Sequence, residues 1–151
     1  MKDLIALLRE RQLTISSMES LTGGLFASEL TKVKDASKVF KGGIVTYSNQ
    51  AKIDVGKVKE EIINEYGAIS SQTSEAMALN CLNIFESDIA LSFTGNAGPS
   101  GSENKKVGLV YTTIIYDKQV FAYKDELSGS RTKIRNDIIK LTIERIKDIL
   151  G

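Results

Sequence analysis

Residues that can carry out acyl chemistry stand close behind two apolar segments of this chain. Ser20 follows the apolar run 13–15 and precedes the glycine pair Gly23–Gly24, while Lys52 follows the run 42–47. A serine hydroxyl becomes a nucleophile when a base takes its proton. A lysine can be that base once burial or a neighbouring cation lowers its pKa. The sequence therefore indicates a serine nucleophile with a lysine base.

Other polar residues accompany this pair. Tyr47 ends the second apolar run, and Thr94 opens a glycine-rich loop. Arg131 and Arg135 stand at the start of the last helical segment, where either one is a candidate for the cation that lowers the lysine pKa or for a group that binds an anion. Cations are unfavourable at the start of a helix, which favours a specific anionic partner for Arg131.

Missing residue types exclude several mechanisms. The chain has no histidine and a single cysteine, Cys81. A Ser-His-Asp triad, an imidazole zinc site, a thiolate cage and an intrachain disulfide are therefore all excluded. We expect Cys81 to be a small buried hydrophobic residue. We expect no metal and no cofactor, and the base of any hydrolase built on this chain must be Lys, Glu, Asp or Tyr.

Each candidate also has an ordinary structural interpretation. Ser20 or Thr22 is a good N-cap for the helix that follows, and Lys52 is of a type that usually lies solvated on a helix. Tyr47 is equally suited to a strand in the core, with its hydroxyl hydrogen-bonded. The glycine-rich loop can be a plain connection, and the two arginines can simply decorate the last helix.

Hydrophobic periodicity and turn residues predict alternating helices and strands. Helices are expected over residues 2–12, 25–32, 59–66, 70–85 and 132–150, with a further helix start near 48–52. Strands are expected over 13–15, 42–47, 88–93, 107–116 and 119–126, the second of them buried. Residues 16–24 are expected to form a turn, and 116–119 a hairpin turn. Ser71, with Ser74 or Glu75, is expected to cap the helix over 70–85.

Five strands interleaved with helices predict an α/β fold. We expect one domain over residues 1–151, a three-layer α/β/α sandwich around a mixed, mostly parallel five-stranded sheet. The Ser20 turn, the 47–52 segment and the 94–101 loop each follow a strand. Because parallel strands end at one edge of a sheet, these three segments should share one cleft.

Composition limits the partners. The chain is 42% hydrophobic and 26% charged, with 20 basic and 19 acidic residues and a net charge of +1. This balance argues against a broad nucleic-acid surface. No run is long enough to cross a membrane and no secretory signal is visible. We therefore expect a cytoplasmic protein with a small-molecule partner, no nucleic acid and no membrane; a homo-oligomer stays open.

Several motifs in one order go beyond composition. They are ESLTGG at 19–24, GIVTYSNQAK at 43–52, YGAIS at 66–70, TGNAGP at 94–99, and SGSR at 128–131 followed by Ile134–Arg135. Together they cover nearly the whole chain, which resembles the CinA C-terminal domain family. Longer members of the family carry a further N-terminal domain that resembles nucleotide pyrophosphatases, and we expect this chain to lack it.

The resemblance implies an amidohydrolase. It implies hydrolysis of the carboxamide of nicotinamide mononucleotide to nicotinic acid mononucleotide and ammonia, in pyridine nucleotide salvage. Ser20 is then the nucleophile and Lys52 its base, with Tyr47 orienting or relaying a proton to the leaving ammonia. The implied substrate-binding residues are Thr22, Gly23, Gly24, Thr94, Gly95, Asn96, Arg131 and Arg135. Backbone N–H groups near 22–23 or 95–96 are expected to hold the oxyanion.

Two residues depart from the family pattern. Leu21 replaces the usual cysteine, which a serine mechanism does not need. Asn96 replaces the usual isoleucine, so it either changes the packing of its loop or adds a polar contact to the substrate. The alternative function is a non-catalytic nucleotide-binding module in competence or DNA-damage responses.

Overall fold

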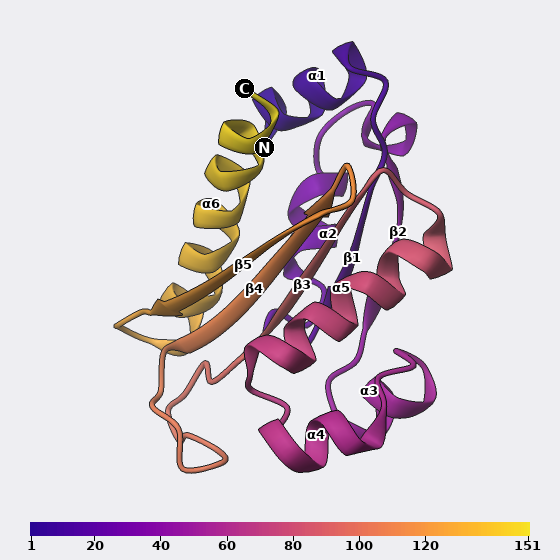
Figure 1. Cartoon of the computed structure of the whole chain (residues 1–151). Coiled ribbons are helices and arrows are strands. Elements are labelled where there is room, and N and C mark those ends of the chain that lie inside the picture. The colour runs from indigo at the N-terminus through magenta and orange to yellow at the C-terminus, as the bar shows by residue number, and fades with distance from the viewer.

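The computed structural model describes the whole chain, residues 1–151 (Figure 1). Its α-helices are α1 (Lys2–Glu10), α2 (Leu25–Thr31), α3 (Asn49–Asp54), α4 (Glu60–Tyr66), α5 (Ser71–Phe85) and α6 (Arg131–Leu150), with a 3-10 helix, η1, at Ala36–Lys38. Its strands are β1 (Ile15–Glu19), β2 (Phe40–Val45), β3 (Ile89–Gly95), β4 (Leu109–Tyr116) and β5 (Gln119–Glu126).

The strands form one mixed sheet in the order β2-β1-β3-β4-β5. Strand β1 pairs in parallel with β2 and β3, while β4 is antiparallel to both β3 and β5. At the carboxyl end of β1, Glu19 lies opposite Val45 on one side and Phe93 on the other. The segments after β1, β2 and β3 therefore begin at the same edge of the sheet, which is where ligands bind in open α/β sheets.

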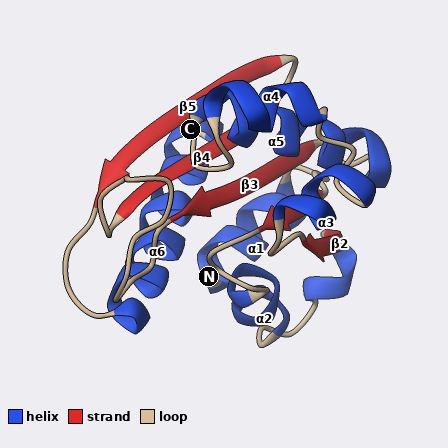
Figure 2. Ribbon diagram, turned by 90° about the horizontal axis from the view of Figure 1, so that it is seen from below, coloured by secondary structure: helices blue, strands red, loops and turns tan.

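Helices cover both faces of the sheet, as Figure 2 shows. The larger core joins α1, α2 and α6 to one face, around fully buried side chains such as Phe26 and Ile138. The smaller core joins α4 and α5 to the other face, around Met77 and Cys81, with Ile53 of α3 packed against it. The predicted three-layer α/β/α sandwich is confirmed, and the parallel part of the sheet is the set β2, β1 and β3.

The hairpin between β4 and β5 lies where it is predicted. Its two central residues, Asp117 and Lys118, both have positive φ angles, 48° and 62°. Two consecutive residues of this kind form the type I′ turn that matches the twist of an antiparallel pair.

Three local predictions are wrong. Residues 16–19 continue strand β1 instead of forming a turn, since Ser16 and Ser17 are fully buried and Ser16 Oγ lies 2.6 Å from Ser87 Oγ. Strand β2 is an edge strand in which half-buried and exposed residues alternate, so it is not buried. The cap of α5 is Ser70, whose Oγ accepts from Thr73 N at 3.2 Å.

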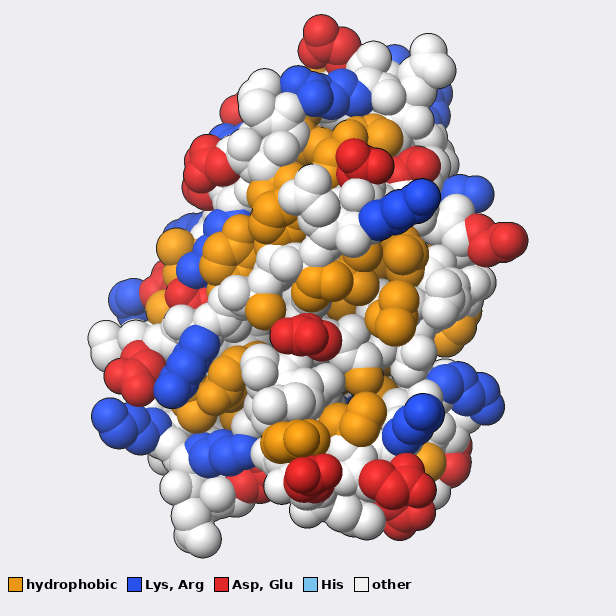
Figure 3. Space-filling model, in the orientation of Figure 1, with side chains coloured by type: hydrophobic (Ala, Val, Ile, Leu, Met, Phe, Trp, Pro, Cys, Tyr) orange, Lys and Arg blue, Asp and Glu red, His pale blue; other side chains and the backbone are white.

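The surface carries charges of both signs. On the face shown in Figure 3, Lys and Arg side chains are interspersed with Asp and Glu, and apolar side chains gather between them. None of the helices combines the length and the apolar character that a membrane crossing requires.

Candidate active site

Ser20 is the first residue after β1, and the backbone fixes its position. Its N–H donates to Phe93 O of β3 at 2.9 Å, and its own carbonyl accepts from Gly23 N at 3.0 Å. Gly23 and Gly24 have φ angles of 56° and 97°, a region that glycine adopts without strain. The tight turn 20–24 thus holds Ser20, which is only 7% exposed, at the carboxyl end of strand β1.

Lys52 reaches Ser20 from helix α3. Ser48 caps this helix by accepting from Ala51 N at 3.0 Å, and Lys52 lies one residue further on. Its side chain is 2% exposed, and its Nζ lies 2.9 Å from Ser20 Oγ and 3.0 Å from Thr46 O. The two residues that the sequence indicates as nucleophile and base are therefore in direct hydrogen-bond contact.

Burial prepares Lys52 to act as a base. Removal from water penalises the charged form and lowers the pKa of Lys52 to about 8, while the carboxylate of Glu103 acts weakly in the opposite direction. Of the two causes that the sequence leaves open, burial and a neighbouring arginine, burial is the one that acts here. At pH 8 about half of the Lys52 side chains are neutral, and a neutral amine can accept the Ser20 proton.

Glu19 anchors the far end of the turn, and sequence reasoning missed it. Its buried carboxylate accepts from Phe26 N at 2.9 Å and Ala27 N at 3.2 Å, in the first turn of α2. No side chain caps α2 at its N-cap residue, Gly24. The interpretation of Ser20 or Thr22 as a helix cap is therefore wrong, because the carboxylate of Glu19, six residues before the first residue of α2, accepts from the N–H groups of its first turn. The ESLTGG motif contains Glu19, but the motif does not show that this carboxylate contacts the first turn of α2.

Arg135 holds the near side of the turn. From α6, its Nε donates to Leu21 O at 3.1 Å and its Nη2 to Thr22 O at 2.7 Å. The same turn leaves the N–H groups of Leu21, Thr22 and Gly24 without a protein acceptor. These free donors lie directly after Ser20. Of the donors considered from sequence, by contrast, Gly23 N is taken up by Ser20 O.

Tyr47 and Arg131 form a pair at the surface. Tyr47 is 60% exposed, and its hydroxyl accepts from Arg131 Nη2 at 2.8 Å. Arg131 Nη1 also donates to Gly98 O at 2.6 Å. The Tyr47 hydroxyl makes no hydrogen bond to Ser20 or Lys52, so in this arrangement it is a partner of Arg131.

The glycine-rich loop uses its polar side chains internally. Thr94 Oγ1 donates to Ala68 O at 2.7 Å. The Asn96 side chain donates to the carbonyls of three residues and accepts from both the N–H and the hydroxyl of Ser102. A Cβ at Gly95 would lie 2.5 Å from Leu109 O, so only glycine fits there. Of the two roles considered for Asn96, loop packing is the one the structure shows.

The same loop is tied to the connection between α4 and α5. The carboxylate of Glu103 accepts from Ala68 N at 2.8 Å and Ile69 N at 2.9 Å, and Lys105 Nζ donates to the carbonyls of Tyr66 and Ile69. Nothing in the local sequence reveals these contacts, because they join residues more than 30 positions apart.

The Ser20–Lys52 pair does not line any of the four hollows in the structure. No group of three or more acidic, cysteine or histidine side chains converges in a way that could hold a metal ion.

Comparison with known proteins shows which family the chain matches. The model of the CinA C-terminal domain matches residues 1–150. A competence-damage inducible protein of Caldicellulosiruptor bescii is 44% identical over 145 residues, which are 95% of this chain and 35% of that protein. A CinA-like protein of Kosmotoga olearia is 41% identical over 148 residues, 97% of this chain and 36% of that protein. The chain thus spans about a third of the length of these curated relatives.

Solved structures agree. The competence/damage inducible protein CihA from Agrobacterium tumefaciens matches with a TM-score of 0.90 at 33% identity, over 99% of this chain and 96% of that one. A CinA superfamily protein from Klebsiella pneumoniae matches with a TM-score of 0.96 at 25% identity, over 99% and 94% of the two chains. None of these names states an enzymatic activity. The chain belongs to the CinA family, through its CinA C-terminal domain.

Proposed function

We propose that this domain hydrolyses the carboxamide of nicotinamide mononucleotide to nicotinic acid mononucleotide and ammonia. One observation carries the proposal: a buried lysine with a pKa of about 8 lies 2.9 Å from the hydroxyl of a buried serine. A structural lysine has little reason to be desolvated against a hydroxyl, because burial of its charge is costly. The choice of substrate rests on the family resemblance.

The reaction begins with proton transfer. Neutral Lys52 takes the Ser20 proton while Ser20 Oγ attacks the amide carbon, which gives a tetrahedral intermediate with a negative oxygen. The free N–H groups of Leu21 and Thr22 are the nearest donors in the sequence to hold that oxygen. Lys52, now an ammonium, returns the proton to the leaving nitrogen, and ammonia departs from a Ser20 ester.

Water completes the cycle. Neutral Lys52 takes a proton from a water molecule, whose oxygen attacks the ester carbon. The second tetrahedral intermediate collapses, and the Ser20 oxygen recovers the proton from Lys52. The product carboxylic acid releases its remaining proton to solvent and leaves as its anion. Lysine is the base in both half-reactions and finishes each one in its starting state.

Arg131 is the group we assign to the nucleotide phosphate. It is exposed, and its hydrogen bonds go to a hydroxyl and a carbonyl, with no carboxylate to neutralise it. An uncompensated guanidinium beside the site is suited to a phosphate. Tyr47, held by the same guanidinium, lies where it can contact the same substrate.

The test is ammonia release from nicotinamide mononucleotide, with a chelator present. The wild-type protein should release ammonia, and Ser20→Ala should lose at least about a thousandfold in kcat, because removal of a nucleophile removes the covalent route. Ser28→Ala, an exposed serine on α2, is the matched control and should keep full activity. Activity of Ser20→Ala within a few-fold of wild type would remove Ser20 as nucleophile. Binding without turnover by the wild type would leave a nucleotide-binding module.

A further inference from the structure

Arg135 directs its guanidinium at the backbone of the turn that carries the nucleophile. Its two donated hydrogen bonds, 3.1 Å to Leu21 O and 2.7 Å to Thr22 O, are with the two residues that follow Ser20. We infer that Arg135 is a positioning residue, which orients the peptide groups of this turn so that their N–H groups face the reacting carbonyl oxygen. The inference rests on the proposed function and deepens it.

Peptide geometry couples the carbonyls that Arg135 holds to the N–H groups of the same turn. In a trans peptide the C=O and the following N–H point in opposite directions within one plane. The carbonyl of Leu21 shares its plane with the N–H of Thr22, so a carbonyl held toward α6 turns that N–H away from α6. The carbonyl of Thr22 is held in the same way, and the N–H of Gly23 in its plane donates to Ser20 O.

The layers of the fold show which side of the sheet an N–H turned away from α6 faces. Helix α6 belongs to the core on one face of the sheet, while α3, which carries Lys52, packs against the core on the other face. An N–H turned away from α6 therefore points toward the side from which Lys52 reaches Ser20. A carbonyl on that side keeps its leaving nitrogen within reach of Lys52, which returns the proton to it.

The packing leaves Arg135 no other partner. It forms no ion pair, both of its side-chain hydrogen bonds go to these two carbonyls, and its Nη2 would be 3.6 Å from a Cβ at Gly23. The guanidinium therefore lies against the glycine of the turn. Arg131, one helical turn earlier, touches Tyr47 and Gly98 instead. Two arginines of one helix thus have different contacts: Arg135 holds the turn after Ser20, and Arg131 holds Tyr47 and the glycine-rich loop.

Kinetics separate positioning from substrate binding. Arg135→Ala should lower kcat about 10- to 100-fold with little change in KM, the effect expected when an oxyanion donor is misplaced. The loss should be equal for nicotinamide mononucleotide and for the phosphate-free riboside, and added guanidinium chloride should restore part of kcat. A rise in KM confined to the nucleotide would overturn the inference, because it would make Arg135 a phosphate ligand.

Two variants on the same helix serve as controls. Lys140→Ala removes an exposed cation of α6 that touches nothing in the site, and it should behave as wild type. Arg135→Lys keeps the charge but can hold only one carbonyl at a time, so its kcat should fall between wild type and Arg135→Ala. Full activity of Arg135→Lys together with that of Arg135→Ala would overturn the inference.

A crystal structure of Arg135→Ala, or of Arg135→Lys if the alanine variant does not fold, tests the orientation without any activity. The peptide between Leu21 and Thr22 should rotate, carrying the Thr22 N–H out of its wild-type direction. An unchanged turn would contradict the positioning role. Absence of ammonia release by the wild type would instead reject the proposed function, while this structure still decides what Arg135 does.

Discussion

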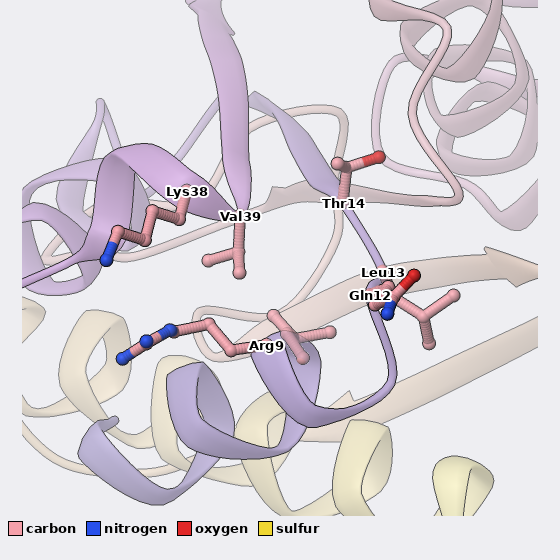
Figure 4. A pocket seen from close by; sticks show the side chains of 7 residues that line it. Arg9, Gln12, Leu13, Thr14, Lys38 and Val39 are labelled. Atoms are coloured by element: carbon pink, nitrogen blue, oxygen red, sulfur yellow. The ribbon is translucent and has the colours of Figure 1, made fainter.

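The two ends of strand β1 carry cations in opposite settings. Before the strand, Arg9 and Lys38 border an open hollow of about 290 Å³ (Figure 4). Both side chains pair with Asp35 at 3.0 Å. After the strand, Lys52 is buried against Ser20 and has no carboxylate in hydrogen-bond range. The end before the strand therefore carries solvated ion pairs, and the end after the strand carries the buried Ser20–Lys52 pair.

The difference shows that burial, more than the presence of a cavity, sets Lys52 apart from the cations at the other end of the strand. Exposed ion pairs such as those of Asp35 contribute little free energy. Burial of Lys52 lowers its pKa to about 8 and so makes a base.

The largest expected effect contrasts the two lysines. Lys52→Ala should lower kcat for ammonia release about a hundredfold to ten-thousandfold, since it removes the general base. Lys38→Ala, at the other end of the strand, should leave kcat within about twofold, because surface substitutions away from a site have small effects. Steady-state assays of the two variants decide this, and similar losses in both would break the contrast.

The second effect concerns stability. Between pH 8 and 10.5 the unfolded chain holds the Lys52 proton and the folded protein does not, so folding is favoured as the pH rises. Relative to Lys52→Met, which cannot titrate, the wild type should gain about 3 kcal/mol of unfolding free energy across this window. Urea unfolding of both proteins at several pH values measures the gain. Lys38→Met, at an exposed lysine, is the matched control. A difference between wild type and Lys52→Met that stays constant with pH would mean that folding does not lower the pKa of Lys52.

The smallest effect concerns Arg131. Arg131→Ala should raise KM for nicotinamide mononucleotide about tenfold, the loss of one charged hydrogen bond of roughly 1.5 kcal/mol. The phosphate-free riboside should be almost unaffected, because it has nothing for the guanidinium to bind. Equal effects on both substrates would give Arg131 a purely structural role through Tyr47 and Gly98.

The sequence alone predicts much of the fold, because periodicity and turn chemistry are local. The hairpin at Asp117–Lys118 and the long final helix need no tertiary information. The sequence predicts that the first strand ends at residue 15, because serines such as Ser16 and Ser17 are typical of turns. They lie in the strand because burial among neighbouring strands overrides that preference.

The site was predictable only where a motif names its residues. Ser20 and Lys52 are the residue types that the chemistry requires, and the structure brings them into contact. The sequence leaves burial and a neighbouring cation open as causes of the lowered pKa, and it does not show the contacts of Glu19 and Arg135 with the turn. These depend on distances between segments up to 114 residues apart, which spacing in a single sequence does not contain.

The central claim is that Lys52 acts as a neutral base, and the pH dependence of kcat/KM tests it most directly. In the wild type, kcat/KM for nicotinamide mononucleotide should rise through a pKa of about 8 and then level off, because the free protein is active when Lys52 is neutral. Lys52→Arg keeps the positive charge but cannot become neutral, so it should stay at least about a hundredfold lower at every pH. Substantial turnover by Lys52→Arg, or a wild-type profile without a rise near pH 8, would contradict the Ser20–Lys52 mechanism.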